Sequence, residues 1–391
     1  MHHSLSPPKP DLTVVIPCLN EEDTLGICLT KLQDVSKHED FSIEVIVADN
    51  GSIDKSCEIA LKFRAQLVHV SDKGYGAAIM GGIKNATSQY ILMADADDSY
   101  DFLEVPKFFR RLEEGFDLVQ GCRLPKGGGT ISKGAMPWSH RYIGNPLFTL
   151  LARNWFGSPI NDVYCGMRAF KKCFYESLKM KCKGMEFATE MIIKAANTQA
   201  KMTEVAITLH QDGRIQHPPH LRTIRDGWRT LQFFLLCAPS KLFLLPGVIM
   251  LLSGLLGSCL GYFGATLGSV QLGAHTMLGS ALIMVSGYQA ILMHNLSLSV
   301  SEKLGIVIKR RKKYFKNFIL SKGMTCAGFF MLSGILLWAN VFSTWQTSGF
   351  SSLDYSSTLK IVIPGATLIS ISLETIIFIL FQSWIRVETN S

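Results

Sequence analysis

Four aspartates stand within seven positions of the chain, directly after a short apolar run. The stretch YILMADADDSYDF (residues 90–102) begins like a buried strand and then carries Asp95, Asp97, Asp98 and Asp101. Carboxylates in close quarters repel one another, so the cluster needs a compensating positive charge, which a hard divalent cation can supply. The alternative is a helix N-terminus, where one or two acids cap the first turn. Four acids exceed what a cap requires, so we predict a cation site.

Polar clusters also follow the other apolar runs of the first third of the chain. Candidate strands lie at 13–18, 41–48, 66–70, 90–94 and 117–121, and helical patterns separate them. This alternation predicts an α/β fold with a mostly parallel sheet, whose ligands bind beyond the carboxyl ends of the strands. The clusters at those ends are Asn20-Glu21-Glu22, Asp49-Asn50, Asp72-Lys73, the four aspartates and Arg123. We therefore expect the five strand ends to build one site.

Two other nucleotide-binding motifs fit the sequence poorly. GYGAAIMGG (residues 74–82) is similar to a dinucleotide fingerprint, but Ile79 replaces the third glycine, and the match follows the third strand. The chain contains no GxxxxGK[ST] loop. A nicotinamide enzyme or a P-loop ATPase is therefore disfavoured.

The motifs together resemble one family. VVIPCLNEE, VIVADNGSIDKS, DKGYGAAIMGG, MADADDSYDF and GCRLP are similar to the catalytic domain of inverting family 2 glycosyltransferases of GT-A type. GAMPWSHRYIGNPLF, NDVYCGMRAF, GMEFATEM and PHLRTIRDGWRTLQF resemble bacterial polyprenyl-phosphate glycosyltransferases, the dolichol-phosphate glucose or mannose synthase-like proteins. The resemblance covers residues 11–240 nearly continuously and implies a cytosolic GT-A domain at 11–220.

The resemblance implies roles for the matching positions. The donor nucleotide would be bound by Pro17, Asn20, Glu22, Asp49, Lys73 and Asp95. Asp95 and Asp97 would hold Mg²⁺ or Mn²⁺ and, through it, the diphosphate. Asp97, Asp162 and Arg168 would act where donor and acceptor meet, although Asp162 could instead form a salt bridge to Arg168. Ser99 stands where relatives often carry glutamine, so the third metal ligand stays open, with Asp98 as a candidate.

The last 150 residues have the composition of a membrane domain. Four apolar stretches, at about 242–267, 274–298, 323–345 and 359–384, are each long enough to cross a bilayer. The loop between the second and third (299–322) carries eight Lys or Arg and one acid, which is +7 of the net charge of +8. The positive-inside rule places this loop and both termini in the cytosol.

The remaining composition supports that topology. Residues 1–10 contain no apolar leader and are expected to be a disordered tail, and 385–391 a cytosolic tail. The ten cysteines show no CxxC and no His/Cys ligand spacing, so we expect reduced, mostly buried thiols without a zinc framework. The glycines at 257, 261, 264 and 268 indicate close helix packing within the membrane domain, or a homo-oligomer.

Two helices are predicted to lie in the membrane interface. Residues 221–240 place Leu221, Ile224, Trp228 and Leu231 on one face, beside Arg222, Arg225 and Arg229. A second helix, at about 145–156, begins at Asn145-Pro146 and would bury Leu147, Leu150, Leu151 and Trp155. The arginines expected to bind the acceptor phosphate are Arg123, Arg141, Arg222, Arg225 and Arg229. The alternative for them is general attraction to anionic headgroups.

The predicted function is transfer of one sugar from a UDP- or GDP-sugar to a polyprenyl phosphate (undecaprenyl or dolichyl) at the cytosolic face. The expected location is the bacterial plasma membrane, with no nucleic-acid partner. Alternatives are another lipid acceptor, such as ceramide or diacylglycerol, and a processive polysaccharide synthase. Such synthases usually carry QxxRW, which is not present in this chain. A scaffold that had lost catalysis would be expected to have lost the aspartates as well.

Overall fold

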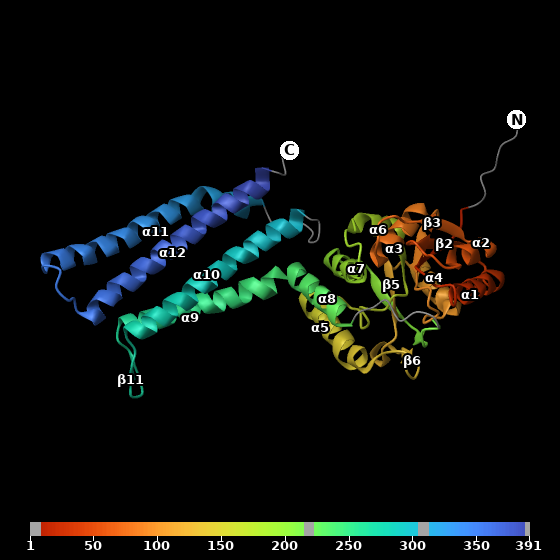
Figure 1. Cartoon of the computed structure of the whole chain (residues 1–391), viewed down its shortest axis with the longest axis horizontal. Coiled ribbons are helices and arrows are strands. Elements are labelled where there is room, and N and C mark those ends of the chain that lie inside the picture. The colour runs from red at the N-terminus through yellow and green to blue at the C-terminus, as the bar shows by residue number, and fades with distance from the viewer. Residues whose placement is uncertain (1–8, 215–222, 304–312, 388–391) are drawn as a thin grey trace. The chain divides into compact units, whose positions relative to one another are not determined.

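The chain divides into two compact units, Met1–Phe234 and Leu235–Ser391 (Figure 1). The computed structural model describes residues 9–214, 223–303 and 313–387. Most of the two predicted tails and part of the basic loop at 299–322 therefore lie outside the described residues.

The N-terminal unit contains a seven-stranded sheet with the order β3-β2-β1-β4-β7-β5-β8. Its strands are β1 (Leu12–Cys18), β2 (Ile43–Asp49), β3 (Gln66–His69), β4 (Tyr90–Met93), β5 (Leu118–Cys122), β7 (Arg168–Lys171) and β8 (Met202–Ala206). Strands β1 to β4 run parallel to one another, and β5 runs parallel to β8. The predicted α/β class with a mostly parallel sheet is confirmed.

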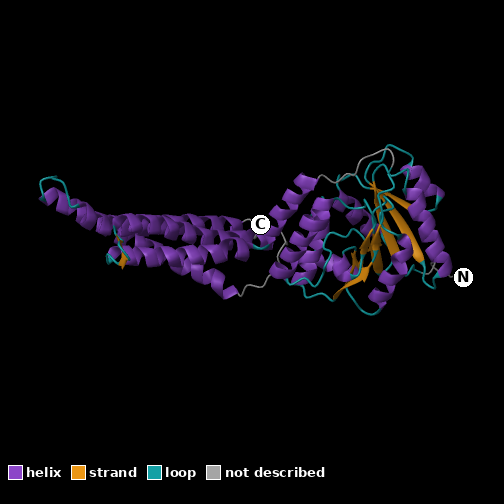
Figure 2. Cartoon of the chain, turned by 90° about the horizontal axis from the view of Figure 1, so that it is seen from below, coloured by secondary structure: helices purple, strands orange, loops and turns teal. Residues whose placement is uncertain are grey.

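Helices cover both faces of this sheet (Figure 2). Side chains alternate along a strand, so neighbouring residues of β1 face opposite layers. Val14 and Ile16 belong to a buried core that also contains side chains of α1 (Leu25–His38) and α4 (Val105–Glu113). Val15 faces α3 (Tyr75–Asn85), where Gly82 packs so closely that a Cβ would collide with it.

Strand β7 was not expected, and it determines the geometry of the site. It runs antiparallel between β4 and β5, with Arg168 opposite both Met93 and Gln120. Because β7 runs against its neighbours, it begins at the edge where they end. The loop before it, which carries Asp162, is thereby brought to the carboxyl ends of the parallel strands.

The remaining elements of this unit are short or helical. They are α2 (Ser56–Lys62), β6 (Thr130–Ile131), a π-helical turn (His140–Gly144), α5 (Asn145–Phe156), α6 (Lys172–Leu178), α7 (Glu186–Asn197), β9 (Thr208–Leu209) and α8 (Thr223–Cys237). Two 3₁₀ turns, Phe102–Glu104 and Pro125–Gly127, complete the unit. Helix α5 packs on α8 through Phe148, Phe156 and Phe234.

The predicted interface helix at 145–156 corresponds to α5, and its two sides differ. Asn145, Phe148, Thr149 and Ala152 are buried in the protein. Leu147 and Leu150 are exposed, at 43% and 54%, and Trp228 of α8 is 59% exposed. These large apolar side chains find no cover within the N-terminal unit, as a membrane-facing surface requires.

The C-terminal unit consists of four long helices and their connections. They are α9 (Leu245–Tyr262, after the π-helical turn Ser240–Leu244), α10 (Ala274–Lys303), α11 (Lys313–Thr347) and α12 (Tyr355–Val387). Each contains a stretch long and apolar enough to cross a membrane: Ser240–Tyr262, Ala274–Glu302, Lys322–Thr347 and Tyr355–Ile385. Most side chains on these stretches are not buried within the protein, as expected for helices surrounded by lipid.

The first span is shorter than its apolar run. Its helix ends at Tyr262, and β10 (Thr266–Leu267) and β11 (Val270–Gln271) form a hairpin, so the predicted span of 242–267 is wrong at its end. Gly264 and Gly268 have φ of +64° and +60°, values that turns require and glycine tolerates. A Cβ on Gly254 would instead collide with Ser280 and Met284 of α10, and a Cβ on Gly261 would collide with Met277 of α10. These glycines therefore pack α9 against α10 within one chain.

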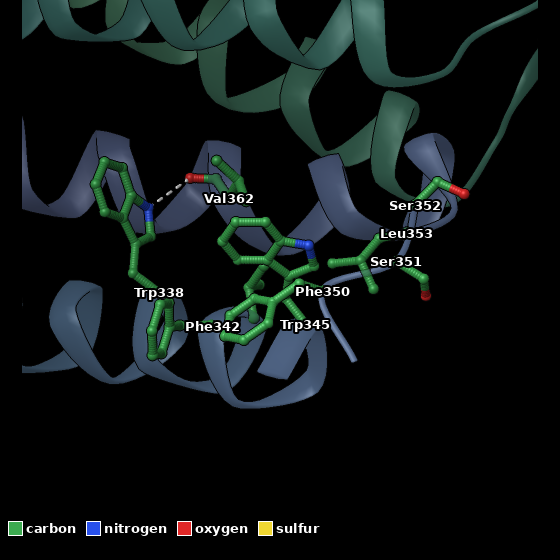
Figure 3. A pocket seen from close by; sticks show the side chains of 9 residues that line it. Trp338, Phe342, Trp345, Phe350, Ser351, Ser352, Leu353 and Val362 are labelled. Atoms are coloured by element: carbon green, nitrogen blue, oxygen red, sulfur yellow. Dashed lines mark hydrogen bonds between the residues drawn. The ribbon is translucent and has the colours of Figure 1, made fainter. Parts of the chain in front are cut away.

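The C-terminal unit also contains a pocket of about 590 Å³ between α11 and α12 (Figure 3). Trp338, Phe342, Trp345 and Phe350 line it, and the Trp338 indole N–H donates to the Val362 carbonyl at 3.2 Å. Its lining residues include no titratable side chain, so the pocket offers no acid, base or metal ligand. The candidate site lies instead at the sheet edge.

Candidate functional site

The ends of β1 and β2 are joined by side-chain hydrogen bonds. The Asn20 amide N–H donates to Ser52 Oγ at 3.0 Å, and the Ile53 amide N–H donates to Asn20 Oδ1 at 2.9 Å. Asn20 has a φ of +57°, which asparagine adopts more readily than most residues. Glu22 Oε2 accepts from the Lys55 amide at 3.0 Å, and Pro17 lies beside Ala48. In this structure Asn20 and Glu22 thus hold the loop after β1 against the loop after β2.

Strands β2 and β3 are joined in the same way through Asn50. Its side-chain amide donates to the carbonyls of Val70 and Asp72, and its Oδ1 accepts from the Gly74 amide. Lys73 reaches back over the turn, where its Nζ donates to the Asn50 carbonyl at 2.7 Å. Asp49 and Lys73, both predicted to bind the donor nucleotide, therefore lie at the same edge of the sheet.

The glycines after β3 serve packing rather than phosphate binding. A Cβ on Gly74 would meet the Lys183 carbonyl oxygen, and a Cβ on Gly76 would meet that of Cys182. The Lys183 carbonyl also accepts from the Ala77 amide at 3.0 Å. Because a neighbouring loop occupies the N-terminus of α3, this segment is not arranged as a dinucleotide fingerprint.

The four aspartates separate into two pairs. Asp98 and Asp101 contact Lys31 Nζ at 2.8 Å and 3.4 Å, and Asp101 Oδ1 also caps the turn at Leu103. Asp98 has a φ of +59°, and its carboxylate is held by Lys31. Asp98 is therefore not available as the third metal ligand. The pair Asp98 and Asp101 is thus structural, whereas the cation site expected at the other pair stays a prediction.

Asp95 and Asp97 are the second pair. Asp95 Oδ1 accepts from the Tyr75 hydroxyl at 2.9 Å, and Asp97 Oδ1 accepts from the Ser99 hydroxyl at 2.6 Å. Burial, followed by the charge of Asp97, raises the pKa of Asp95 to about 7. The surroundings of Asp95 thus disfavour a second negative charge, a condition that a cation would reverse. Carboxylate oxygens are the ligands that Mg²⁺ and Mn²⁺ prefer, so these residues fit such an ion.

Arg214 is a site residue that the sequence analysis missed. Its Nη1 lies 2.7 Å from Asp212 and 3.4 Å from Asp97, and its Nε donates to Glu21 Oε2 at 2.8 Å. Asp97 and Gly213 are also linked, because the Gly213 amide donates to the Asp97 carbonyl at 2.9 Å. A polar, glycine-containing stretch, HQDGR at 210–214, was the available signal.

Asp162 pairs with Arg123, not with Arg168. Asp162 is fully buried, and its two carboxylate oxygens accept from Arg123 Nε at 2.7 Å and Nη2 at 2.8 Å. The Arg123 amide donates to the same carboxylate at 2.9 Å. Burial opposes the charge of Arg123, but Asp162 outweighs it and raises the pKa of the guanidinium. Arg123, which was predicted to bind phosphate, is therefore only 8% exposed and is already paired with Asp162.

Arg168 is fully buried as well, but its guanidinium donates to neutral groups. Its Nη1 donates to the Ala188 carbonyl and its Nη2 to the Cys165 carbonyl, both at 2.8 Å. Burial lowers the pKa of Arg168, while the Tyr75 hydroxyl and Asp95 act in the opposite direction. Arg168 thus contributes a buried positive charge behind the aspartate pair rather than a surface contact.

The other predicted acceptor arginines lie on the exposed elements. Arg141 lies over the Tyr142 ring at 5.4 Å, Arg225 is exposed, and Arg229 Nε contacts Glu186 Oε1 at 2.8 Å. Arg222 lies outside the described residues. Arg214 therefore contacts Asp97 of the aspartate pair, whereas Arg141, Arg225 and Arg229 lie on other segments of the chain.

Comparison with known proteins identifies two family domains. Residues 13–178 match the glycosyl transferase family 2 domain, and residues 296–386 match the glycosyltransferase family 2 C-terminal transmembrane region. The chain is 34% identical over 362 residues to the low-salt glycan biosynthesis hexosyltransferase Agl6 of Haloferax volcanii, covering 90% of this chain and 86% of the relative. A dolichyl-phosphate hexose transferase of the same organism is 31% identical, covering 50% of this chain and 82% of that protein.

Solved structures include a weaker likeness. A glucosyl-3-phosphoglycerate synthase from Mycobacterium tuberculosis, crystallised with Mn²⁺, uridine diphosphate and glucosyl-3-phosphoglycerate, is 19% identical, with a TM-score of 0.47. It covers 58% of this chain and 79% of that structure. The long match to Agl6, which spans both units, carries the assignment: the chain is a membrane glycosyltransferase of family 2, with a GT-A-type catalytic unit.

Proposed function

We propose that this glycosyltransferase moves a single sugar from a nucleotide-diphosphate sugar to a polyprenyl phosphate, with its catalytic unit in the cytosol. The observation that carries the proposal is the pair Asp95 and Asp97, two carboxylates held at one strand end, where burial already opposes the charge of Asp95. A donor diphosphate adds more negative charge, so donor binding there needs a cation.

On the donor side, the nucleotide would lie along the ends of β1, β2 and β3. Asp49, Asn20 and Pro17 would hold the base and ribose, with Lys73 and Glu22 at the border of the same edge. Asp95 and Asp97 would hold Mg²⁺ or Mn²⁺, which supplies Lewis-acid stabilisation of the leaving diphosphate when bound. Arg214 already contacts Asp97 and would have to shift as the cation binds, since both compete for the same carboxylate.

The reaction forms a bond between a lipid phosphate oxygen and the anomeric carbon, and breaks the bond from that carbon to the diphosphate. Attack from the face opposite the leaving group inverts the anomeric configuration. A phosphate monoester has a second pKa near 6, so it is largely a dianion at neutral pH and requires no general base. The protein must instead position it, which arginines do well through paired N–H donors.

The acceptor side would be formed by Arg141, Arg222, Arg225 and Arg229. Arg123 is the exception, because Asp162 already accepts from two of its nitrogens. Its remaining Nη1 lies 3.4 Å from the Tyr100 hydroxyl, which leaves little capacity for a phosphate. We therefore assign Arg123 and Asp162 to positioning, and Arg168 to the charge balance behind Asp95.

Exposed apolar side chains on α5 and α8 would hold the catalytic unit at the membrane surface. The basic residues of 299–322 favour a cytosolic orientation. The relative named as a dolichyl-phosphate hexose transferase supports a polyprenyl phosphate acceptor over ceramide or diacylglycerol. The location in the bacterial plasma membrane stays a prediction.

Product identification tests this proposal. The full-length protein in lipid nanodiscs would be given labelled UDP-glucose, UDP-N-acetylglucosamine or GDP-mannose, with undecaprenyl phosphate, dolichyl phosphate, ceramide or diacylglycerol. We expect one donor to yield a polyprenyl-phosphate monosaccharide by mass spectrometry. A glycosylated ceramide or diacylglycerol, or a product with many sugars, would assign the alternative function instead.

Arginine variants test the acceptor side in the same assay. Arg225→Lys keeps the charge but loses paired N–H donors, so we expect a KM for polyprenyl phosphate about tenfold higher. Arg111→Lys, on α4 and paired with Glu114, is the matched control and should leave the KM unchanged. If Arg225→Lys also leaves it unchanged, this arginine only attracts headgroups.

A further inference from the structure

A second set of metal-binding side chains lies at the sheet edge, away from the aspartate pair. Asp49 ends β2, Cys57 lies in the first turn of α2, and His69 ends β3. Their ligand atoms, a carboxylate oxygen, a thiol sulfur and an imidazole nitrogen, all lie within 4.8 Å of one another. This cluster could not be predicted from the sequence, because the three residues follow no ligand spacing and meet only through the fold.

The cluster is largely prearranged. Asp49 is buried, and its Oδ1 accepts from the Ser52 amide at 2.9 Å while its Oδ2 accepts from the Gly51 amide at 3.2 Å. His69 Nδ1 lies 3.1 Å from the same Oδ2. In a tetrahedral zinc site, ligands about 2.1 Å from the metal stand about 3.4 Å apart. The carboxylate and imidazole are therefore already near that separation.

The aspartate pair and the cluster of Asp49, Cys57 and His69 offer different ligand atoms and therefore favour different metal ions. Asp95 and Asp97 offer only oxygen, which suits hard cations, whereas sulfur and imidazole nitrogen favour Zn²⁺ and other borderline or soft ions. Cys57 is half-buried and His69 is exposed, so an ion can reach them from solvent. The geometry points to a zinc site formed by Asp49, Cys57 and His69, with a fourth position left for water.

Binding involves a defined proton exchange. The Cys57 thiol loses its proton to solvent as the Zn–S bond forms, and His69 binds through a neutral Nδ1. Asp49 turns one oxygen from His69 to the metal and keeps its bonds from the Gly51 and Ser52 amides. No electrons are transferred, so the site needs no oxidant or reductant.

The site has a consequence for donor binding, which rests on the proposed function. Asp49 is one of the residues proposed to hold the nucleotide base and ribose. A metal bound to its carboxylate would compete with the base for the same oxygens. We therefore expect Zn²⁺ at this site to inhibit nucleotide binding, in contrast to Mg²⁺ or Mn²⁺ at Asp95 and Asp97, which would support it.

Cobalt substitution tests the metal site directly. Co²⁺ bound to a thiolate gives a charge-transfer absorption that oxygen ligands cannot produce, so the signal excludes the aspartate pair. We expect the full-length protein in detergent to show it at one equivalent, with Zn²⁺ displacing Co²⁺. Cys57→Ser should abolish the band, and His69→Gln should weaken Co²⁺ binding about tenfold or more.

Matched controls use a cysteine and a histidine outside the cluster. Cys173→Ser on α6 removes an exposed thiol, and His38→Gln replaces the imidazole at the end of α1. Both variants should leave the charge-transfer band and the affinity for Co²⁺ unchanged. Absence of a band, or a band that survives Cys57→Ser, would overturn the proposed site. The His69–Asp49 contact would then be only a surface pair.

Nucleotide titration separates this site from the proposed function. With Mg²⁺ present, Zn²⁺ should raise the apparent Kd for UDP or GDP in the wild type and not in Cys57→Ser. If zinc binds through Cys57 but the nucleotide Kd does not change, the metal site stands and the placement of the base on Asp49 fails. If zinc does not bind through Cys57, the metal site fails whatever the nucleotide does.

Discussion

Two groups of carboxylates at the sheet edge, Asp162 on one side and the pair Asp95 and Asp97 on the other, have opposite surroundings. Asp162 is fully buried and accepts three hydrogen bonds from Arg123, whose guanidinium balances its charge. Asp95 and Asp97 stand two positions apart and accept hydrogen bonds from the hydroxyl groups of Tyr75 and Ser99. Asp97 shares Arg214 with two other acids, Glu21 and Asp212. The first region is complete by itself, whereas the second retains excess negative charge.

The difference shows what distinguishes a structural carboxylate from a ligand-binding one. Both kinds lie in motifs, both contact arginine, and both are shielded from solvent. A one-to-one pair with matched donors gains little from a ligand, because its hydrogen-bonding capacity is used. A cluster with more acids than cations gains much from a metal ion, so of these two regions the second is the one suited to bind one.

The largest predicted effect concerns the complete pair. Asp162→Ala leaves Arg123 buried without its partner, which costs about 3–5 kcal/mol. The midpoint of thermal unfolding of the catalytic unit should fall by about 10 °C, measured on the full-length protein in detergent. Asp34→Asn, which removes an exposed pair with Lys37, should shift it by less than about 2 °C. Equal midpoints for Asp162→Ala and wild type would show that the pair does not stabilise the fold.

A smaller effect is predicted at the open region, on metal affinity rather than on folding. Tyr75→Phe removes the hydroxyl that donates to Asp95, and burial raises the pKa of Tyr75, so this donor keeps its proton. We expect the Mn²⁺ concentration for half-maximal transfer to rise about tenfold, with little change at saturating Mn²⁺. Tyr90→Phe, at the start of β4, is the control and should change neither value. Unchanged metal dependence in Tyr75→Phe would contradict the role of the hydroxyl.

The smallest predicted effect concerns Ser99, which stands where relatives often carry glutamine and where the third metal ligand was left open. Ser99→Ala removes the hydroxyl on Asp97 but keeps the Ser99 amide, which also donates to Asp97 Oδ1 at 3.1 Å. The loss of one of two donors should weaken Mn²⁺ about two- to threefold. A loss as large as that of Asp97→Asn would instead make Ser99 a direct metal ligand.

Local pattern was sufficient for the five parallel strands and for the cluster at their ends. Strand β7 could not be predicted in the same way, because RAFK is four residues long and its antiparallel pairing depends on β4 and β5. The first membrane helix was predicted too long because an apolar run does not reveal that Gly264 and Gly268 adopt positive φ.

The pairing of the charges also lay beyond the sequence. Asp162 pairs with Arg123, 39 residues away, and Arg214 contacts Glu21 across 193 residues. A salt bridge between Asp162 and Arg168 was the alternative that their nearness in sequence offered, but strand geometry turns Arg168 toward neutral carbonyls. Residue types at motif positions could be predicted, whereas which charges cancel depends on the folded sheet.

The most direct test is sugar transfer to polyprenyl phosphate by wild type and Asp97→Asn, with and without excess chelator, at equal amounts of folded protein. We predict that the wild type loses transfer on chelation and recovers it with Mn²⁺ or Mg²⁺. Asp97→Asn should be about 100-fold slower or worse at any metal concentration, with an unfolding midpoint no lower than wild type. Near-normal transfer by Asp97→Asn, or by chelated wild type, would contradict metal-dependent catalysis at the aspartate pair.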